Sequence, residues 1–579
     1  MDVAAAIVAL RTAQGLSTAS LARLLGVSRS SIDRWEKGEV APSPLAMSQL
    51  RELGLPAGLD ETSEPPAARD DHFEVRVRGV SHSVEPAPYV VNGQADQAPL
   101  FRSLYELQGQ TSPRVEDSTY MRRLSAVTRV DLVGEETAQS RLENVSPHRK
   151  SWNSNYGSHG WHRYVGRFPP HIVRAALNGF NAAPGDTVLD PFAGSGTTLL
   201  EARLLGLRGI GVEISPLSAL IARTKACFPA DAADRLKVLQ DNLSGHYPDR
   251  WRSFVGSADL SEIAFEKLLE RRGNAIGGFP NFEKWMTKDA FLGCSIIVEM
   301  VLALDDGFER DALMVALSSQ MRSIGNVDVD VVRAEYRKEP RSGVDVLRLV
   351  QRLLGKMRSD VVAMNRTHYG LLGEASDITL IEGSVLDAEI PRGSVDCVIT
   401  SPPYGVESLS YLRTHLLSFR VLQPILGADP YEANAGVIGS EYLPKESMPP
   451  TRCRTAVISE QFVRYFDEVA GDATGDRTQT NRVNMMMHFF DDMLSVTERL
   501  SEWVRPGGNL ALVVGNKRIG DRIIPTDEIM RDIMESCGFE SGRTTKHKLK
   551  TNNSNSVVPW QERTIQDEYI MLFKRSSDA

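Results

Sequence analysis

The apolar and polar positions after residue 160 follow two alternating patterns. Short, nearly continuous apolar runs that end in a turn or loop are typical of buried strands, and runs with apolar residues three or four positions apart are typical of helices. Because the two kinds of run alternate, we predict an α/β fold with a doubly wound, mostly parallel sheet. The patterns predict strands at 187–189, 209–213, 378–381, 395–400, 509–514 and 569–573, and helices at 171–180, 197–205 and 483–500.

Residues 217–375 interrupt this alternation. They have helical periodicity and no strand signal, so we expect a helical insert after the second strand. Within it, residues 322–366 contain ten Lys and Arg against six Asp and Glu, a local balance of +4. Residues 314–326 predict a helix that ends in a polar turn. The insert is interpreted either as a basic contact surface for an acidic partner or as a brace packed against the sheet.

The beginning of the chain predicts a separate helical unit over residues 6–53. Ser28 can cap a helix over residues 29–37, in which Ile32 and Trp35 face inward. A stretch rich in Pro, Ala and acidic residues follows and is typical of a linker. The expected organisation is a small all-α domain (1–55), a linker with an unassigned segment (56–150), an α/β domain (151–216 and 376–579) and the helical insert (217–375).

Composition narrows the class of protein. A chain of 579 residues is too long for one ordinary core, and contents of 42% hydrophobic and 24% charged residues are those of a globular protein. We find no apolar run of membrane-spanning length and no secretory start, which predicts a cytoplasmic protein. The five cysteines lack zinc-ligand spacing, so we expect reduced thiols and no metal site. The net charge of −9 requires any nucleic-acid surface to be a local basic face.

Residues 190–198 read DPFAGSGTT and join a predicted strand to a predicted helix. Gly194 and Gly196 allow the backbone to approach a ligand, and the amides at the start of the helix favour a carboxylate. Glu213 ends the next strand with an acid that can accept both hydroxyls of a ribose. This spacing fits a dinucleotide as well as another adenosine-containing cofactor, so it leaves the cofactor open.

Residues 400–404 read TSPPY and follow another predicted strand. The Ser401 hydroxyl and the Pro402 carbonyl can accept both N–H bonds of an exocyclic amine, which localises the nitrogen lone pair for attack on a methyl group. Pro402 and Pro403 fix the backbone, and Tyr404 offers a face for an extruded base. The bland alternative is a Pro-Pro turn after a buried strand.

Together, the two strings resemble those of the DNA amino-methyltransferases that use S-adenosylmethionine (SAM). The resemblance implies a Rossmann-like methyltransferase sheet, SAM as the cofactor, double-stranded DNA as the partner, base flipping, and catalysis by the clamp residues Ser401, Pro402, Pro403 and Tyr404. In this family Ser at the first clamp position favours cytosine N4 and Asp favours adenine N6, so Ser401 favours cytosine N4. The cofactor contacts that it implies are Phe168, Asp190, Pro191, Phe192, Gly194, Gly196, Thr197, Thr198, Glu213, Ile214 and Asp387.

The pattern over residues 28–38 resembles the helix-turn-helix of repressor-like regulators. The resemblance implies that Arg29, Ser30, Ser31 and Arg34 face the major groove or the phosphates of DNA. A dimerisation or docking module is the structural alternative. A DNA-bound enzyme of this kind is expected at the nucleoid, with a cognate restriction or defence protein as a candidate partner.

Several alternatives remain open. The alternatives are an adenine N6 DNA methyltransferase, an RNA amino-methyltransferase with a related clamp, and a transcriptional regulator that binds SAM only as a sensor. An intact Ser401 and Tyr404 argue against the sensor. No Cys follows a Pro, which argues against carbon-5 cytosine methylation. Lys517 and Arg518 are interpreted either as phosphate contacts or as surface residues.

Overall fold

The computed structural model divides the chain into two units, Met1–Glu74 and Val75–Ala579. In the first, α1 (Val3–Ala13) buries Ala6 and Ile7, and Ile32 and Trp35 are buried as the periodicity predicts. The predicted DNA-facing residues Arg29, Ser30, Ser31 and Arg34 lie outside the described residues. The structure describes residues 3–14, 16, 18, 21, 32, 35–36, 50, 155–164, 166–183, 185–256, 259–272, 276, 282–327, 337, 341, 343–365, 377–405, 411–439, 453–472, 477–519, 522–548 and 567–577.

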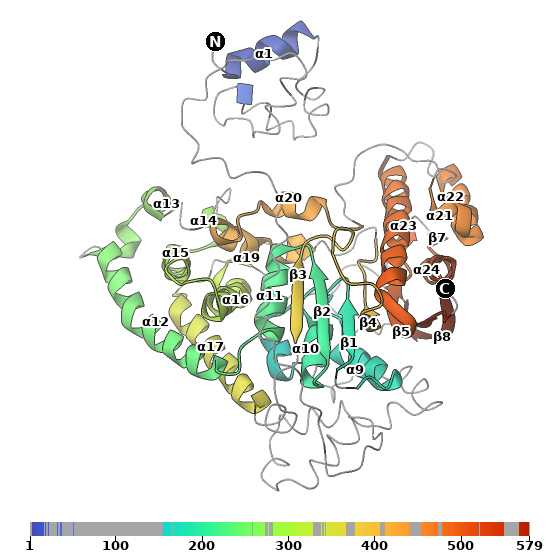
Figure 1. Cartoon of the computed structure of the whole chain (residues 1–579). Helices are drawn as coiled ribbons and strands as arrows, with labels where there is room; N and C mark the ends of the chain where they lie inside the picture. Colours follow the sequence, from blue (N-terminus) through green and yellow to red (C-terminus); the bar gives the residue numbers. More distant parts are fainter. Residues whose placement is uncertain are drawn as a thin grey trace, which may run out of the picture. The chain divides into compact units, whose positions relative to one another are not determined.

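The second unit is built on a seven-stranded sheet with the order β3-β2-β1-β4-β5-β9-β8 (Figure 1). The first five of these strands are parallel, whereas β9 runs antiparallel to β5 and to β8. The doubly wound, mostly parallel sheet is therefore confirmed. The strands are β1 (Thr187–Asp190), β2 (Arg208–Glu213), β3 (Ile378–Glu382), β4 (Val395–Thr400), β5 (Val504–Gly515), β8 (Phe539–Lys548) and β9 (Asp567–Arg575).

Helices cover both faces of the sheet because successive strand residues point to opposite sides. Val188 packs with α9 (Pro170–Gly179) and α10 (Thr197–Leu204), while the adjacent Leu189 belongs to the cluster on the other face. That second cluster contains side chains of α23 (Arg477–Trp503) and α24 (Thr526–Ser536). Nearly continuous apolar strands are the expected result of burial on both faces.

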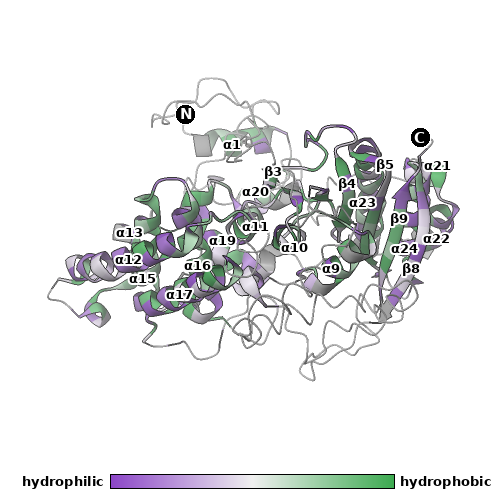
Figure 2. Cartoon of the chain, turned by 60° about the horizontal axis from the view of Figure 1, so that its bottom comes forward, coloured by the Kyte–Doolittle hydropathy of each residue, from purple (hydrophilic) through white to green (hydrophobic). Residues whose placement is uncertain are grey.

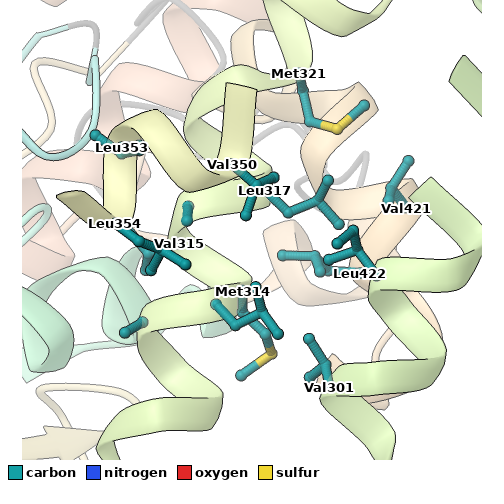
Figure 3. Packing of buried hydrophobic residues seen from close by; sticks show 14 of the residues in the cluster. Val301, Met314, Val315, Leu317, Met321, Val350, Leu353, Leu354, Val421 and Leu422 are labelled. Atoms are coloured by element: carbon teal, nitrogen blue, oxygen red, sulfur yellow. The ribbon is translucent and has the colours of Figure 1, made fainter. Parts of the chain in front are cut away.

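Helices also fill the described part of the chain between β2 and β3. The apolar sides of α15, α16 and α17 meet there, and α19 (Tyr411–Leu426) contributes Val421 and Leu422 to the same core from beyond β4 (Figure 3). The helices in this region are α11 (Pro216–Ala226), α12 (Ala232–Val255), η3 (Leu260–Glu262), α13 (Phe265–Arg272), α14 (Phe282–Trp285), α15 (Lys288–Leu302), α16 (Phe308–Ile324) and α17 (Val346–Met364).

The predicted helix at 314–326 corresponds to the second half of α16. Met314, Val315, Leu317 and Met321 are buried in the helical core, with no more than 4% of any of them exposed. These side chains therefore brace the helices against one another. A DNA contact made by other parts of the insert stays a prediction.

The C-terminal part contains elements that the periodicity does not predict. Strand β8 is the outermost strand and is largely hydrophilic, in contrast to the apolar central strands β4 and β5 (Figure 2). Basic side chains such as Lys546 are common on sheet edges, where they discourage pairing with another chain. The remaining short elements are η2 (Gly157–Gly160), α20 (Pro430–Ala435), α21 (Thr455–Ile458), α22 (Glu460–Asp472), β6 (Arg518–Ile519) and β7 (Arg522–Ile523). Among the described helices, none has the length and apolar character needed to cross a membrane.

A buried polar cluster joins α10 to the segment before α9. Glu201 is completely buried and accepts hydrogen bonds from Tyr156, from His159 Nε2 at 2.7 Å and from Arg174 Nε at 2.6 Å. Burial alone would raise the pKa of Glu201, but the charge of Arg174 and these hydrogen bonds lower it to about 2. Glu201 is thus the anion that balances a guanidinium with no solvent access.

Removing this anion should destabilise the fold strongly. Glu201→Ala leaves the buried Arg174 guanidinium without its counter-charge, which we expect to lower the free energy of unfolding by about 3–5 kcal/mol. The matched control is Glu468→Ala, because the Glu468–Arg522 pair has side chains that are 52% and 44% exposed. We expect that control to cost about 0–1 kcal/mol in urea denaturation. Equal losses in the two variants would contradict the role assigned to Glu201.

Candidate active site

The strand order reverses between β1 and β4, and the loops that follow these strands diverge there. Chain segments after β1 lead toward β2 and β3, while β4 continues toward β5. In open α/β sheets ligands bind at the carboxyl ends of the strands at this point. A cavity occupies that position and is lined by residues that follow β1, β2, β3 and β4.

This cavity brings the two sequence motifs together, although they are about two hundred residues apart in the chain. Gly383, Ser384 and Val385, which follow β3, complete this part of the wall. The sequence-predicted residues that line it are Phe168, Asp190, Pro191, Phe192, Gly194, Thr197, Glu213, Ile214, Ser401 and Pro403.

Five predicted residues lie outside the lining. Gly196 and Thr198 of the glycine loop are buried, Pro402 lies between the two clamp residues that do line the cavity, and Tyr404 follows them. Asp387 is exposed on the loop after β3, while its neighbour Val385 faces the cavity. A role for Asp387 in cofactor binding stays a prediction.

Asp190 connects the two motifs directly. It ends β1, is 3% exposed, and accepts hydrogen bonds from Thr400 Oγ1 at 2.7 Å and from the Phe192 amide at 3.1 Å. Thr400 is the last residue of β4 and immediately precedes Ser401. Burial raises the pKa of Asp190 to about 6, and its hydrogen bonds oppose that rise.

Glu213 lies at the end of β2 and faces the glycine loop. Its Oε2 accepts a hydrogen bond from the Gly194 amide at 2.8 Å and its Oε1 accepts one from the Ser215 amide at 2.8 Å. Burial raises the pKa of Glu213 to about 7, and the nearby Asp190 contributes to the rise. The cavity wall therefore holds two acids whose ionised forms lack much of their hydration.

The glycine loop leaves little room for side chains. Gly196 has φ +76°, and a Cβ there would lie 2.9 Å from Cα of Ala222 on α11. Below the loop, the completely buried Lys225 donates a hydrogen bond to the Ser195 carbonyl at 2.7 Å. Burial lowers the pKa of Lys225 well below its ordinary value. The loop is thus held from beneath while its upper side faces the cavity.

The residues present fit a cofactor with a hydroxylated ribose and an amino-acid end. The carboxylate of Glu213 is in place for ribose hydroxyls. Ser195 Oγ and Thr197 Oγ1 are buried hydroxyl oxygens with no hydrogen-bond partner among the described residues, and both residues line the cavity. Such hydroxyls, together with the amides that open α10, are suited to a ligand carboxylate.

Hydrogen bonds hold the C-terminal end of the TSPPY segment in place. Ser401 Oγ lies 3.0 Å from Tyr404 Oη, and Tyr404 Oη donates to Glu568 Oε1 at 3.3 Å. Burial raises the pKa of Glu568, and the hydrogen bond from Tyr404 opposes the rise. Lys517 Nζ donates to the Gly405 carbonyl at 3.2 Å, and this lysine is only 1% exposed. The interpretation of Lys517 as a surface residue is wrong because its side chain is buried, and a phosphate contact stays a prediction.

Other residues that line the cavity are not identified by the sequence motifs. Tyr164 stacks on His415 of α19 with ring centroids 5.0 Å apart, and both line the cavity. Burial lowers the pKa of His415 to about 4, so its imidazole is neutral near neutral pH. Residues from α20 to Ile438 also line the cavity. Of the lining residues that precede β1, the sequence resemblance identifies Phe168.

Within the described residues, no group of three or more His, Cys, Asp or Glu side chains is arranged to hold a metal ion. The five cysteines are free thiols. Burial raises the pKa of the Cys397 thiol on β4, which keeps this residue in its unreactive protonated form.

The raised pKa of Asp190 predicts a pH-dependent stability. Because the folded state raises this pKa from 3.8, Asp190 favours folding at low pH, and that contribution is lost as the pH rises through about 6. Asp190→Asn cannot ionise. We expect the free energy of unfolding of the variant, relative to the wild type, to rise by about 2–3 kcal/mol between about pH 4 and about pH 7. The substitution also removes the repulsion between the Asp190 charge and Glu213, which stabilises the variant further as the pH rises.

Urea denaturation across this pH range measures the difference. The exposed Asp249→Asn, with 68% of the side chain accessible, is the matched control. A difference that does not change with pH, or one that the control reproduces, would contradict the assignment of a buried, protonatable Asp190.

Two family models match segments of the chain. A family model described as DNA methylase matches residues 107–223, which contain the glycine loop and Glu213, and a helix-turn-helix family model matches residues 7–53. The first match begins inside the segment that sequence patterns left unassigned. It ends before the TSPPY motif.

Individual relatives extend the likeness. The chain is 25% identical over 455 residues to the type II methyltransferase M.BsoBI from Geobacillus stearothermophilus, which covers 73% of this chain and 86% of that protein. It is 47% identical over 114 residues to the type II methyltransferase M.MjaII from Methanocaldococcus jannaschii, 20% of each chain. A likeness of 41% over 51 residues, 9% of this chain and 15% of the other, links it to a tRNA (guanine(10)-N2)-dimethyltransferase from Methanothermobacter thermautotrophicus.

Over most of its length the chain is therefore related to type II methyltransferases, and its predicted resemblance to the DNA amino-methyltransferases, with a repressor-like helix-turn-helix at the N-terminus, is confirmed.

Proposed function

We propose that this chain transfers a methyl group from SAM to an exocyclic amino group of a base flipped out of DNA, with cytosine N4 as the favoured acceptor. The observation that carries the proposal is the shared cavity. Ser401 of the clamp and Glu213 beside the glycine loop line the same space, and the Asp190–Thr400 hydrogen bond fixes the two motifs relative to each other. A cofactor site and an amine site would then be adjacent.

The residues divide into two groups by the chemistry they offer. Glu213, Ser195 and Thr197 would bind the ribose and amino-acid parts of the cofactor, which supplies an electrophilic methyl group when it is bound. Ser401 Oγ and the Pro402 carbonyl would accept the two N–H bonds of the target amine. Positioning of this kind supplies much of the rate in reactions that form no covalent enzyme intermediate.

The transfer would form one N–C bond, break one S–C bond and release one proton. The amine nitrogen forms a bond to the methyl carbon while the electron pair of the S–C bond returns to sulfur. The nitrogen would then release one proton to water. Because Ser401 is a neutral acceptor, it matches the family preference for cytosine N4, and adenine N6 is the alternative acceptor.

Duplex DNA is the proposed substrate because a family model described as DNA methylase matches residues 107–223 and the N-terminal segment matches a helix-turn-helix model. Arg29, Ser30, Ser31 and Arg34 are the residues proposed to contact it. A cognate restriction or defence partner stays a prediction.

Transfer of labelled methyl from SAM to duplex DNA, with mass spectrometry of the nucleosides and total RNA as competitor, tests the proposal. We expect N4-methylcytosine. N6-methyladenine would overturn the choice of base and keep the enzyme class. Label in RNA would overturn DNA as the substrate, and SAM binding without transfer to varied DNA would favour a sensor.

The clamp residue has a distinct expected signature. Ser401→Ala should lower methyl transfer about a hundredfold or more, because the amine loses one of its two acceptors, while the Kd for SAM stays unchanged. Ser384→Ala is the matched control, since Ser384 lines the same cavity after β3 and is not part of the TSPPY segment. It should keep transfer at saturating SAM. Loss of SAM binding in Ser401→Ala would contradict the role assigned to this residue.

A further inference from the structure

The hydrogen-bonded chain from Ser401 through Tyr404 ends on a carboxylate that belongs to neither motif. Glu568 lies near the start of β9, 164 residues after Tyr404. Among the described residues, the hydroxyl of Tyr404 is the side-chain donor recorded for it. The partly buried Glu568 therefore contacts the clamp through Tyr404, which does not line the cavity.

The topology of the sheet places Glu568 there. β5 pairs in parallel with β4, so that Leu512 is opposite Thr400, and β5 ends at Gly515. β9 runs antiparallel to β5, with Glu568 opposite Gly515. The beginning of an antiparallel strand lies at the edge where its parallel neighbours end. Glu568 is therefore at the same edge as the clamp although it is remote in sequence.

This arrangement fixes the direction of both hydrogen bonds. An ionised carboxylate can only accept, so when Glu568 is ionised the single hydroxyl proton of Tyr404 is donated to it. The bond between Ser401 and Tyr404 must then be donated by Ser401 to the phenolic oxygen. The proton of Ser401 points away from the cavity as a result, and the lone pairs of its oxygen remain available to the target amine.

A serine at the first clamp position needs such a device. Its hydroxyl can donate or accept, and a donor aimed at the amine nitrogen would compete for the lone pair that must attack the methyl group. An ionised aspartate at that position can only accept and needs no orienting partner. We propose that Glu568 is a positioning residue that acts through Tyr404 to keep Ser401 an acceptor of the target amine. This inference rests on the proposed methyl transfer and names a further residue on which it depends.

The experiment compares Glu568→Gln with the wild type in the full-length protein, using single-turnover methyl transfer to DNA at saturating SAM. The Gln amide can donate to the phenolic oxygen and so reverse the chain. We expect the transfer rate to fall about tenfold or more, while the KM for SAM and the melting temperature stay unchanged. Glu540→Gln is the matched control, because Glu540 is exposed on β8 at the opposite end of the β8–β9 pair.

A double-mutant cycle with Tyr404→Phe separates this role from a general structural one. The phenyl ring keeps the face for base stacking and removes only the linking hydroxyl. If Glu568 acts through that hydroxyl, Glu568→Gln has no further effect on the rate in the Tyr404→Phe background. An equal loss in both backgrounds would overturn the inference.

The remaining outcomes are also decisive. An active wild type that Glu568→Gln matches in rate overturns the inference alone and leaves the proposed function intact. A wild type that transfers no methyl group to any nucleic acid overturns the proposed function and this inference with it. If Glu568→Gln lowers the melting temperature, the comparison of Tyr404→Phe with the double variant still tests the inference. In that comparison the effect of Glu568→Gln on the rate is measured against a folded Tyr404→Phe variant.

Discussion

The hydrogen bond between Asp190 and Thr400 is the constraint on which the site depends. It joins the ends of β1 and β4, the two strands between which the strand order reverses. The glycine loop begins immediately after one end and the TSPPY clamp immediately after the other. A bond of 2.7 Å between buried partners therefore sets the distance between the proposed cofactor and amine sites. Since both strands are packed on both faces, neither end can shift without disturbing the core.

This arrangement carries a cost in stability that is typical of functional sites. Asp190 and Glu213 are two acids with raised pKa values on one cavity wall, and the charge of Asp190 contributes to the raised pKa of Glu213. Backbone amides of the glycine loop satisfy part of the charge of Glu213. The contrast with Glu201 is informative, because that buried acid has a guanidinium partner and a lowered pKa. Glu201 is thus paired with the cation Arg174, whereas Asp190 and Glu213 have no cationic partner among the described residues.

The sequence predicts the parts of this structure in which local pattern and tertiary burial agree. The strand at 395–400 was predicted with the observed bounds, since a strand buried on both faces is continuously apolar. β8 and α24 were missed: β8 is an edge strand with little apolar content, and α24 has a polar outer face. The burial of Lys517 is not predicted, because nothing in its local sequence shows that a basic side chain will be buried beside the Gly405 carbonyl.

The TSPPY segment shows which feature of a site a sequence motif does not specify. A motif records residues that are adjacent in sequence and therefore locally positioned, such as Ser401 and Tyr404. The direction in which their hydroxyl protons point depends on a third group, and the antiparallel pairing of β9 with β5 supplies it. A serine, unlike an aspartate, leaves that direction undetermined. The chemistry that the motif indicates therefore depends on the pairing of the strands, because Glu568 on β9 completes the hydrogen-bonded chain that begins at Ser401 after β4.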